Sequence, residues 1–372
     1  MTRARSAAAL AACAAVASLL GCARSLPPPG GPVDATPPSV LATSPADSSL
    51  RVPRDGTVEL LFSEGMDRAS VRDNVRLFPP AGRPGYDWSG RRFRVTWGES
   101  LRAGTTYQVF LSGRARDLRG VLMGRPSLIR FSTGDSIAPG AITGVLRAKT
   151  LTRQGVPILL FPDLLGARPD TSYAFEPAYQ AETDTAGVYA FAGLPLDEGF
   201  TVHAFYDRNG DSYFDGEQDV LASYGEAVRL TPGRALADSI NLTAVDPRAP
   251  GILSGSIVTP DSTARFRIEI RAAADSSVVA KTERLGPGTF AVRVPAGSYR
   301  VSARRLATVF RPARPGAVAP AAPVMTEAYT ILDPVVAVGP EEERGPFVLT
   351  FPPGAAAAPE APPPPEPQED SR

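Results

Sequence analysis

The stretch GVYAFAGLPLDEGFTVHAFYD (residues 187–207) decides the fold of the central part of the chain. Apolar residues alternate with small or polar ones on both sides of the segment LPLDEG. This alternation is typical of β-strands that bury one face, and Pro, Asp and Gly between them mark a turn. The stretch therefore predicts a pair of strands joined by a short connection.

The same pattern returns about 110 residues further along the chain. The segment GTFAVRVPAGSYRVSA (residues 288–303) parallels the strand pair, and GILSGSIV (residues 251–258) parallels GAITGVLR (residues 140–147). Two copies of one β-sandwich explain this repeat better than a single large sandwich. The copies differ after the second strand, where only the first has the acidic segment DRNGDSYFDGEQD (residues 207–219).

Residues 37–134 are predicted to form another all-β module. Four segments show strand-like alternation between turn residues: VELLF (58–62), RFRVTW (92–97), TYQVFL (106–111) and LIRFST (128–133). Short strands at this spacing favour a two-sheet sandwich. The fold class predicted for the whole chain is therefore all-β, with tandem sandwiches.

The motifs of residues 37–134 resemble those of the bacterial Ig-like domain found in S-layer proteins and envelope lipoproteins. The resemblance covers nearly the whole module and implies a structural or spacer unit without a catalytic site. The matching residues are Ser44-Pro45, Phe62-Ser63-Glu64, Met66-Asp67, Leu101, Gly104-Thr105-Thr106-Tyr107, Asp117, Gly120 and Phe131-Ser132-Thr133-Gly134.

The segment 140–245 resembles the prealbumin-like sandwich of carboxypeptidase regulatory domains. That resemblance implies a module that supports others and is not itself catalytic, and the repeat extends it to residues 251–351. It rests on Ile142, Gly144, Val145, Asp184–Gly187, Tyr189, Phe191, Leu194 and Pro195.

The N-terminus has the features of a secretory signal. Two arginines precede an apolar run from Ala7 to Leu20, which is too short for a comfortable membrane-spanning helix. The run ends in Leu19-Leu20-Gly21-Cys22, which resembles a bacterial lipobox. This implies cleavage before Cys22 and acylation of that residue, whereas an ordinary signal peptide or an uncleaved anchor is the alternative. Ala23 follows instead of Asp, which by analogy favours the outer membrane.

The predicted mature chain has no disulfide. The full sequence has two cysteines, Cys13 inside the signal and the predicted lipid-bearing Cys22, so the modules must be stable through packing. Both ends are rich in proline and are predicted to be extended or disordered. The predicted organisation is a signal peptide at 1–21, a tether at 22–36, an Ig-like module at 37–134, regulatory-like sandwiches at 140–245 and 251–351, and a tail at 352–372.

The charge distribution argues against nucleic acid as a partner, because the formal net charge of the 372 residues is zero. The charges are nevertheless uneven. Residues 37–134 contain 15 basic and 9 acidic side chains, whereas residues 135–245 contain 7 and 15. This contrast is either ordinary variation on solvated surfaces or a sign that the two modules dock.

No catalytic motif of a known type occurs in the sequence. The chain has one histidine, His203, which we interpret as a strand residue at a surface or in a core. Carboxylate pairs such as Glu64 with Asp67, or Asp211 with Asp215, could serve a hydrolase, but nothing distinguishes them from ordinary acids. Among the aromatic residues, Trp97 is predicted to lie in the core. Trp88, in a Gly-rich segment, is predicted to be the more exposed tryptophan.

The acidic segment 207–219 is a candidate calcium site. Asp207, Asn209 and Asp211 place oxygen ligands on alternate residues, and Asp215 falls at position 9, as in an EF-hand loop. Position 6 is Ser212 instead of Gly, and position 12 is Gln218 instead of Glu, where only Glu217 or Asp219 could substitute through a changed loop path. Strands flank the segment. The alternative is a polar turn held by its own backbone amides.

These features together predict a non-catalytic envelope lipoprotein that acts as a structural, spacer or adhesion protein. Its expected partners are the membrane, through the lipid, and an envelope protein or glycan. Two alternatives remain: a carboxylate-dependent hydrolase of envelope polymers and an accessory subunit of an envelope complex.

Overall fold

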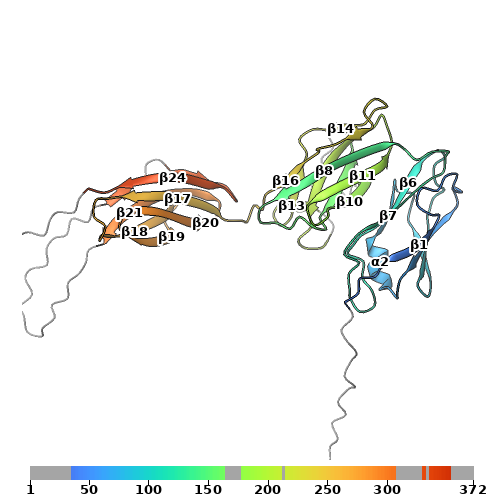
Figure 1. Cartoon of the computed structure of the whole chain (residues 1–372), viewed down its shortest axis with the longest axis horizontal. Helices are drawn as coiled ribbons and strands as arrows, with labels where there is room; N and C mark the ends of the chain where they lie inside the picture. The colour runs from blue at the N-terminus through green and yellow to red at the C-terminus, as the bar shows by residue number, and fades with distance from the viewer. Residues whose placement is uncertain (1–34, 164–176, 212–213, 307–328, 332–334, 353–372) are drawn as a thin grey trace, which may run out of the picture.

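The computed structural model of the chain describes residues 35–163, 177–211, 214–306, 329–331 and 335–352. Within them the chain is almost entirely β-structure, which confirms the all-β fold class (Figure 1). The predicted lipobox, most of the tether and nearly all of the tail lie outside the described residues. In the described part, no helix has the length and apolar character needed to cross a bilayer.

The first module (residues 37–134) is built from two antiparallel sheets, ordered β1-β2-β5-β4 and β3-β6-β7. Large buried side chains from both sheets, including Phe62, Phe93 and Phe131, meet in one core. Its strands are β1 (Val40–Ser44), β2 (Thr57–Phe62), β3 (Val75–Phe78), β4 (Gly85–Ser89), β5 (Arg92–Thr96), β6 (Thr106–Leu111) and β7 (Ser127–Ser132).

The described part of the chain contains one α-helix, α2 (Arg68–Asn74), which the sequence analysis did not predict. Asp67 caps its N-terminus by accepting hydrogen bonds from the backbone N–H groups of Ala69 (3.0 Å) and Ser70 (3.2 Å). Only Val71 of the helix is buried. Seven residues with a single buried position are too few to show a helical period in sequence.

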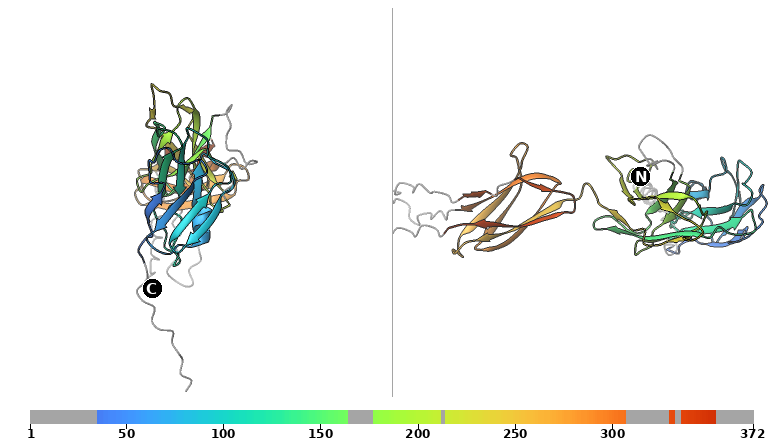
Figure 2. Two further views of the ribbon diagram at one scale, coloured as in Figure 1. Left: turned by 90° about the vertical axis from the view of Figure 1, so that its right-hand side faces the viewer. Right: turned by 90° about the horizontal axis from the view of Figure 1, so that it is seen from above.

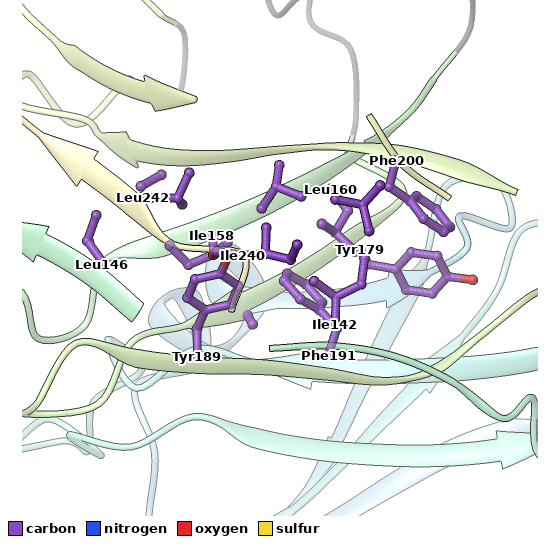
Figure 3. Packing of buried hydrophobic residues seen from close by; sticks show 14 of the residues in the cluster. Ile142, Leu146, Ile158, Leu160, Tyr179, Tyr189, Phe191, Phe200, Ile240 and Leu242 are labelled. Atoms are coloured by element: carbon purple, nitrogen blue, oxygen red, sulfur yellow. The ribbon is translucent and has the colours of Figure 1, made fainter. Parts of the chain in front are cut away.

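The second module (residues 140–245) also has two sheets. One is ordered β10-β9-β12-β13 with β14 beside β12, and the other β11-β8-β15 with β16 beside β8. Their facing side chains form the core seen in Figure 3. The strands are β8 (Gly140–Ala148), β9 (Pro157–Pro162), β10 (Tyr179–Glu182), β11 (Val188–Leu194), β12 (Gly199–Tyr206), β13 (Val220–Ser223), β14 (Val228–Arg229), β15 (Leu236–Ala237) and β16 (Leu242–Ala244).

The third module (residues 251–351) repeats this pairing. Strand β17 pairs antiparallel with β20 and parallel with β24, as β8 does with β11 and β16. The other sheet is ordered β19-β18-β21-β22, with β23 beside β21. The repeat read from the sequence is therefore a repeat of topology. The strands are β17 (Gly251–Val258), β18 (Arg265–Ala272), β19 (Val278–Leu285), β20 (Gly288–Val294), β21 (Gly297–Leu306), β22 (Tyr329–Ile331), β23 (Val336–Val338) and β24 (Glu343–Thr350).

A glycine in the first strand of each copy explains the shared GxxxG pattern of the two opening segments. Gly144 pairs with Tyr189 across β8 and β11, and Gly255 pairs with Phe290 across β17 and β20. A Cβ at Gly255 would lie 2.6 Å from the ring of Phe290, and a Cβ at Gly144 would lie 2.7 Å from the Tyr189 hydroxyl. In both copies an aromatic side chain therefore occupies the space that a side chain on the glycine would need.

The three modules follow one another in space as in sequence (Figures 1 and 2). The first and second modules lie against each other, and a short segment leads from the second to the third. Each module has its own cluster of buried hydrophobic residues, and the cluster of the second module also includes two residues of the first.

Candidate functional site

The acidic segment 207–219 connects the antiparallel strands β12 and β13, whose register pairs Tyr206 with Val220. Three of its carboxylates, those of Asp207, Asp211 and Asp219, each offer an oxygen within 4.8 Å of the others. The burial of these side chains differs. Asp219 is buried, Asp207 is half-buried and Asp211 is exposed. The segment thus places three anionic oxygen donors around one point at the end of a β-hairpin.

The structure keeps three of the four predicted ligands, Asp207, Asn209 and Asp211, together and places the fourth, Asp215, in a turn. Asn209 lies beside Asp211, donating a hydrogen bond to its carboxylate (2.8 Å) and accepting one from its backbone N–H (3.1 Å). Asp215 instead caps a turn, where it accepts hydrogen bonds from the N–H of Glu217 (2.9 Å) and the amide of Gln218 (2.9 Å). These hydrogen bonds, that of Glu217 first, hold the pKa of Asp215 below its usual value.

Asp219 takes the place in the cluster that spacing had given to Asp215. Its two oxygens accept hydrogen bonds from the backbone N–H groups of Arg208 (2.9 Å) and Asp215 (2.9 Å). They therefore tie the two ends of the loop together. Asp219 immediately precedes the buried Val220, which begins β13. This position next to a strand is the feature of the sequence that could have identified Asp219 as a member of the cluster.

The same loop also touches the segment that leads into the third module. Arg208 forms an ion pair with Asp246 (2.8 Å), and Arg248 donates a hydrogen bond to the carbonyl of Glu217 (2.8 Å). Burial raises the pKa of Asp246, but the hydrogen bonds from Arg208 and from the backbone of Arg248, together with the charges of both arginines, outweigh it and hold the pKa below its usual value. Both ends of the loop thus hold the connection between the second and third modules, which we call the second joint.

Glu341 of the third module forms hydrogen bonds with residues of the second module and of the connecting segment at the second joint. Its carboxylate accepts hydrogen bonds from the hydroxyl of Thr150 and from the backbone N–H of Asp246 (3.3 Å). Its backbone carbonyl accepts one from Lys149 (3.2 Å). Burial and the nearby Glu341 charge raise the pKa of Tyr206 to about 12, so this hydroxyl stays protonated at neutral pH. The joint is polar and is made of side chains from both modules.

The joint between the first and second modules, the first joint, is buried. Gln108 is 1% exposed and donates a hydrogen bond to the carbonyl of Ala192 (2.7 Å). Phe78 and Phe110 of the first module belong to the hydrophobic cluster of the second, with the ring centroids of Phe78 and Tyr179 6.3 Å apart. The structure buries these residues on the face of β3 and β6 that points away from their own core.

The contrast in charge between the first two modules raised the possibility that they dock, and the structure shows that they do. Glu182 of the second module accepts hydrogen bonds from the hydroxyl of Ser112 and the N–H of Gly113 (3.2 Å). Within the residues that the structure describes, however, no ion pair crosses the joint. Apolar contact and hydrogen bonds hold it, and the difference in net charge is not its cause.

Asp67, from one of the carboxylate pairs considered for a hydrolase, makes structural contacts. Asp67 caps α2 and pairs with Arg116 (3.2 Å), and its pKa is lowered mainly by the hydrogen bond from the Ser70 N–H. A shallow cavity of about 260 Å³ lies beside this helix, lined in part by Asp73, Asn74 and Arg114. Glu64, Asp67, Asp211 and Asp215 do not line it.

The remaining candidates are packed side chains. His203 is 4% exposed, with its Nδ1 2.8 Å from the hydroxyl of Ser223 and its ring against the edge of Phe161. Trp88 and Trp97 are both half-buried against the core of the first module. Trp88 lies in strand β4 and not in a loop, and its ring lies against Phe93 (centroids 4.6 Å apart).

Comparison with known proteins gives a family for part of the chain. Residues 34–133 match the family model described as "Bacterial Ig-like domain". No curated protein matches the chain.

Several solved structures share a general resemblance. The Bacillus anthracis TIE protein is 11% identical, with 87% of this chain and 58% of that chain covered (TM-score 0.21). A putative cell adhesion protein from Bacteroides ovatus is 11% identical over 58% and 93% (TM-score 0.27). An L,D-transpeptidase from Mycobacterium smegmatis is 15% identical over 56% and 90% (TM-score 0.21). The chain spans less than two thirds of the TIE protein. The family similarity is confined to residues 34–133, which match the bacterial Ig-like domain.

Proposed function

We propose that the chain is a non-catalytic lipoprotein of the cell envelope that acts as a stiff spacer and presents its β-sandwich modules away from the membrane. The observation that carries this proposal is the buried first joint. A fully buried hydrogen-bonded amide and two aromatic rings favour one relative orientation of the two modules. The Ig-like match at residues 34–133 supports a structural role.

The second and third modules are proposed to be prealbumin-like sandwiches. Their shared strand pairing and the paired glycine and aromatic residues support a common fold. We further propose that Cys22 carries the lipid, which places the first module nearest the membrane. The predicted tether of about 15 residues would separate the two by up to roughly 45 Å if fully extended.

Replacing Cys22 with Ser is expected to remove the lipid and release the protein from the membrane fraction, because one short apolar run anchors it poorly. Metabolic labelling with palmitate followed by membrane fractionation measures both effects. Cys13→Ser is the matched control, since this cysteine lies inside the predicted signal. Equal labelling of the Cys22→Ser and wild-type proteins would contradict the anchor.

The loop 207–219 is proposed to bind a structural calcium ion through Asp207, Asp211 and Asp219, with Asn209 beside them. The three carboxylates supply hard anionic oxygens, which calcium prefers. Because the loop also holds the second joint through Arg208 and Arg248, the ion would stiffen the connection to the third module.

Calcium is expected to raise the melting temperature by about 3–10 °C at about 10 mM, given a dissociation constant of roughly 10⁻⁴–10⁻³ M for an extracellular site. A thermal melt with calcium and with chelator measures this shift. The Asp207→Ala/Asp211→Ala variant should lose it, whereas Asp238→Ala, an exposed acid elsewhere in the second module, should keep it. The same melting curve in calcium and in chelator would favour the simple polar turn.

A further inference from the structure

The outer face of one sheet in the third module is strongly basic. In β18, Phe266, Ile268 and Ile270 point into the core, so the residues between them point outward. The outward residues of β18 and its neighbours β19 and β21 form what we call the basic face. Its charged residues are Arg265, Arg267, Arg271, Lys281, Arg300 and Arg304, with the two acids Glu269 and Glu283. Val278, Leu285, Ser302 and Leu306 lie between them on the same face.

Strand register brings these side chains together on one surface. Glu283, Arg267 and Arg304 lie in one row across the three strands. Lys281 and Glu269 lie in the next row. Because paired residues of neighbouring antiparallel strands share a face, the charges form a grid on one surface, with Leu285 and Leu306 on either side of Arg265. The three strands lie side by side in Figure 1.

Half of the cations are already partnered. Arg267 pairs with Glu283 (2.7 Å), and Glu269 pairs with Arg271 (2.8 Å) and Arg304 (3.7 Å). The hydrogen bond from Arg271, together with the surrounding positive charge, lowers the pKa of Glu269. Glu269 and Glu283 thus each form an ion pair with arginines of the same face.

The other three cations are available. In the described part of the chain, Arg265, Lys281 and Arg300 have no side-chain hydrogen bond and no ion pair, and all three are exposed. They lie on three different strands. An anion that meets them would need to extend across the face.

The opposite face of the same module has a different character. The outward residues of the sheet β20-β17-β24 are mostly neutral and include Ser254, Ser256, Thr289 and Ala291 as well as the exposed Val258 and Val348. Arg293 is the basic residue of β20 on that face. The positive charge of the module is therefore concentrated on one side and does not follow from an even spread of arginine.

We propose that the basic face binds a linear acidic polysaccharide. The distance along β18 from Arg265 to Arg271 is about 20 Å, which a chain of sugars can span and a single small anion cannot. The free cations would pair with carboxylate groups of the polymer, while Glu269 and Glu283 can accept hydrogen bonds from its hydroxyl groups. The charges of the face and of the polymer are complementary.

A lipid bilayer fits this face less well. Exposed apolar side chains lie only towards its ends, at Leu285 and Val278, whereas its middle holds Lys281 and Glu269, whose charges cannot enter a hydrocarbon layer. The inference goes beyond the spacer role, because it gives the third module a ligand that the spacer does not need.

The test uses the full chain with Cys22→Ser, so that an anchor cannot attach it to vesicles. Polygalacturonate is the acidic probe, dextran is the neutral polymer, and phosphatidylglycerol vesicles report on lipid. Titration calorimetry at low and high salt is expected to show binding of polygalacturonate that weakens as salt screens the charges.

The triple variant Arg265→Ser/Lys281→Ser/Arg300→Ser is expected to bind polygalacturonate about tenfold more weakly, as three partly screened ion pairs allow. The control Arg229→Ser/Arg234→Ser/Arg293→Ser removes the same charge from exposed sites elsewhere and should change binding by less than about twofold. Circular dichroism checks that both variants are folded.

Several results would overturn the inference. These are no binding of polygalacturonate, equal binding of dextran, or equal losses in the two triple variants. Vesicle binding that depends on the basic face, without polymer binding, would assign the face to lipid instead. None of these results bears on palmitate labelling at Cys22, so the spacer proposal is tested separately.

Discussion

Gly144→Ala is expected to destabilise the second module by about 3 kcal/mol or more, because the added carbon has no space. A Cβ at this position would collide with the carbonyl of Ile240 and with the Tyr189 hydroxyl, which donates a hydrogen bond to that carbonyl. The collision is with backbone in the middle of a sheet, where neither β8 nor the segment before β16 can move alone. Urea denaturation followed by circular dichroism measures the loss.

Gly225→Ala is the matched control for this change. No atom lies within 4 Å of a Cβ at Gly225, so its replacement should alter the free energy of unfolding by no more than about 0.5 kcal/mol. If Gly144→Ala were as stable as Gly225→Ala, the close approach of the two strands would be wrong. The pairing of Gly255 with Phe290 would then also lose its explanation.

Phe110→Ala is expected to cost about 3–5 kcal/mol and to separate the unfolding of the first two modules. The ring is 2% exposed and belongs to the hydrophobic cluster of the second module, although β6 is part of the first. Removing it leaves a cavity at the first joint, on the edge of the cluster of the second module, and should leave the core of the first module intact. Calorimetry should then show an additional transition at lower temperature.

The control for this prediction is Leu118→Ala, whose side chain is 76% exposed on the first module. It should leave the melting profile unchanged within about 1 °C, since exposed substitutions rarely alter stability. A Phe110→Ala protein that melts with the wild-type profile would show that the first joint does not couple the modules. The proposed stiff spacer would then lose its main support.

Strand positions and the repeat could be predicted because they depend on local periodicity. The segments TYQVFL and GILSGSIV coincide with β6 and β17, and the repeated glycine pattern marks equivalent strands. The helix α2 was not predicted because it has only seven residues and begins at the Asp67 cap, without a repeating apolar pattern. Trp88 was misplaced because glycines beside β4 were interpreted as a loop, whereas β4 pairs with β5.

The candidate site was predicted only in part. Spacing within the segment identified Asp207, Asn209 and Asp211, which do lie together. It assigned Asp215 where the structure has Asp219, because the path of a loop depends on which backbone amides its acids accept. The contact of the same loop with Asp246 joins residues far apart along the chain, and no local pattern encodes it.

The sequence alone determined the all-β class, the alternating strands and the two related copies, since these follow from period-two burial and turn residues. Alternation in β6 directs Thr106, Gln108 and Phe110 away from the core of the first module. Only the tertiary structure decided that all three are buried. The second module covers that face, and whether a face meets water or another module depends on contacts between distant parts of the chain.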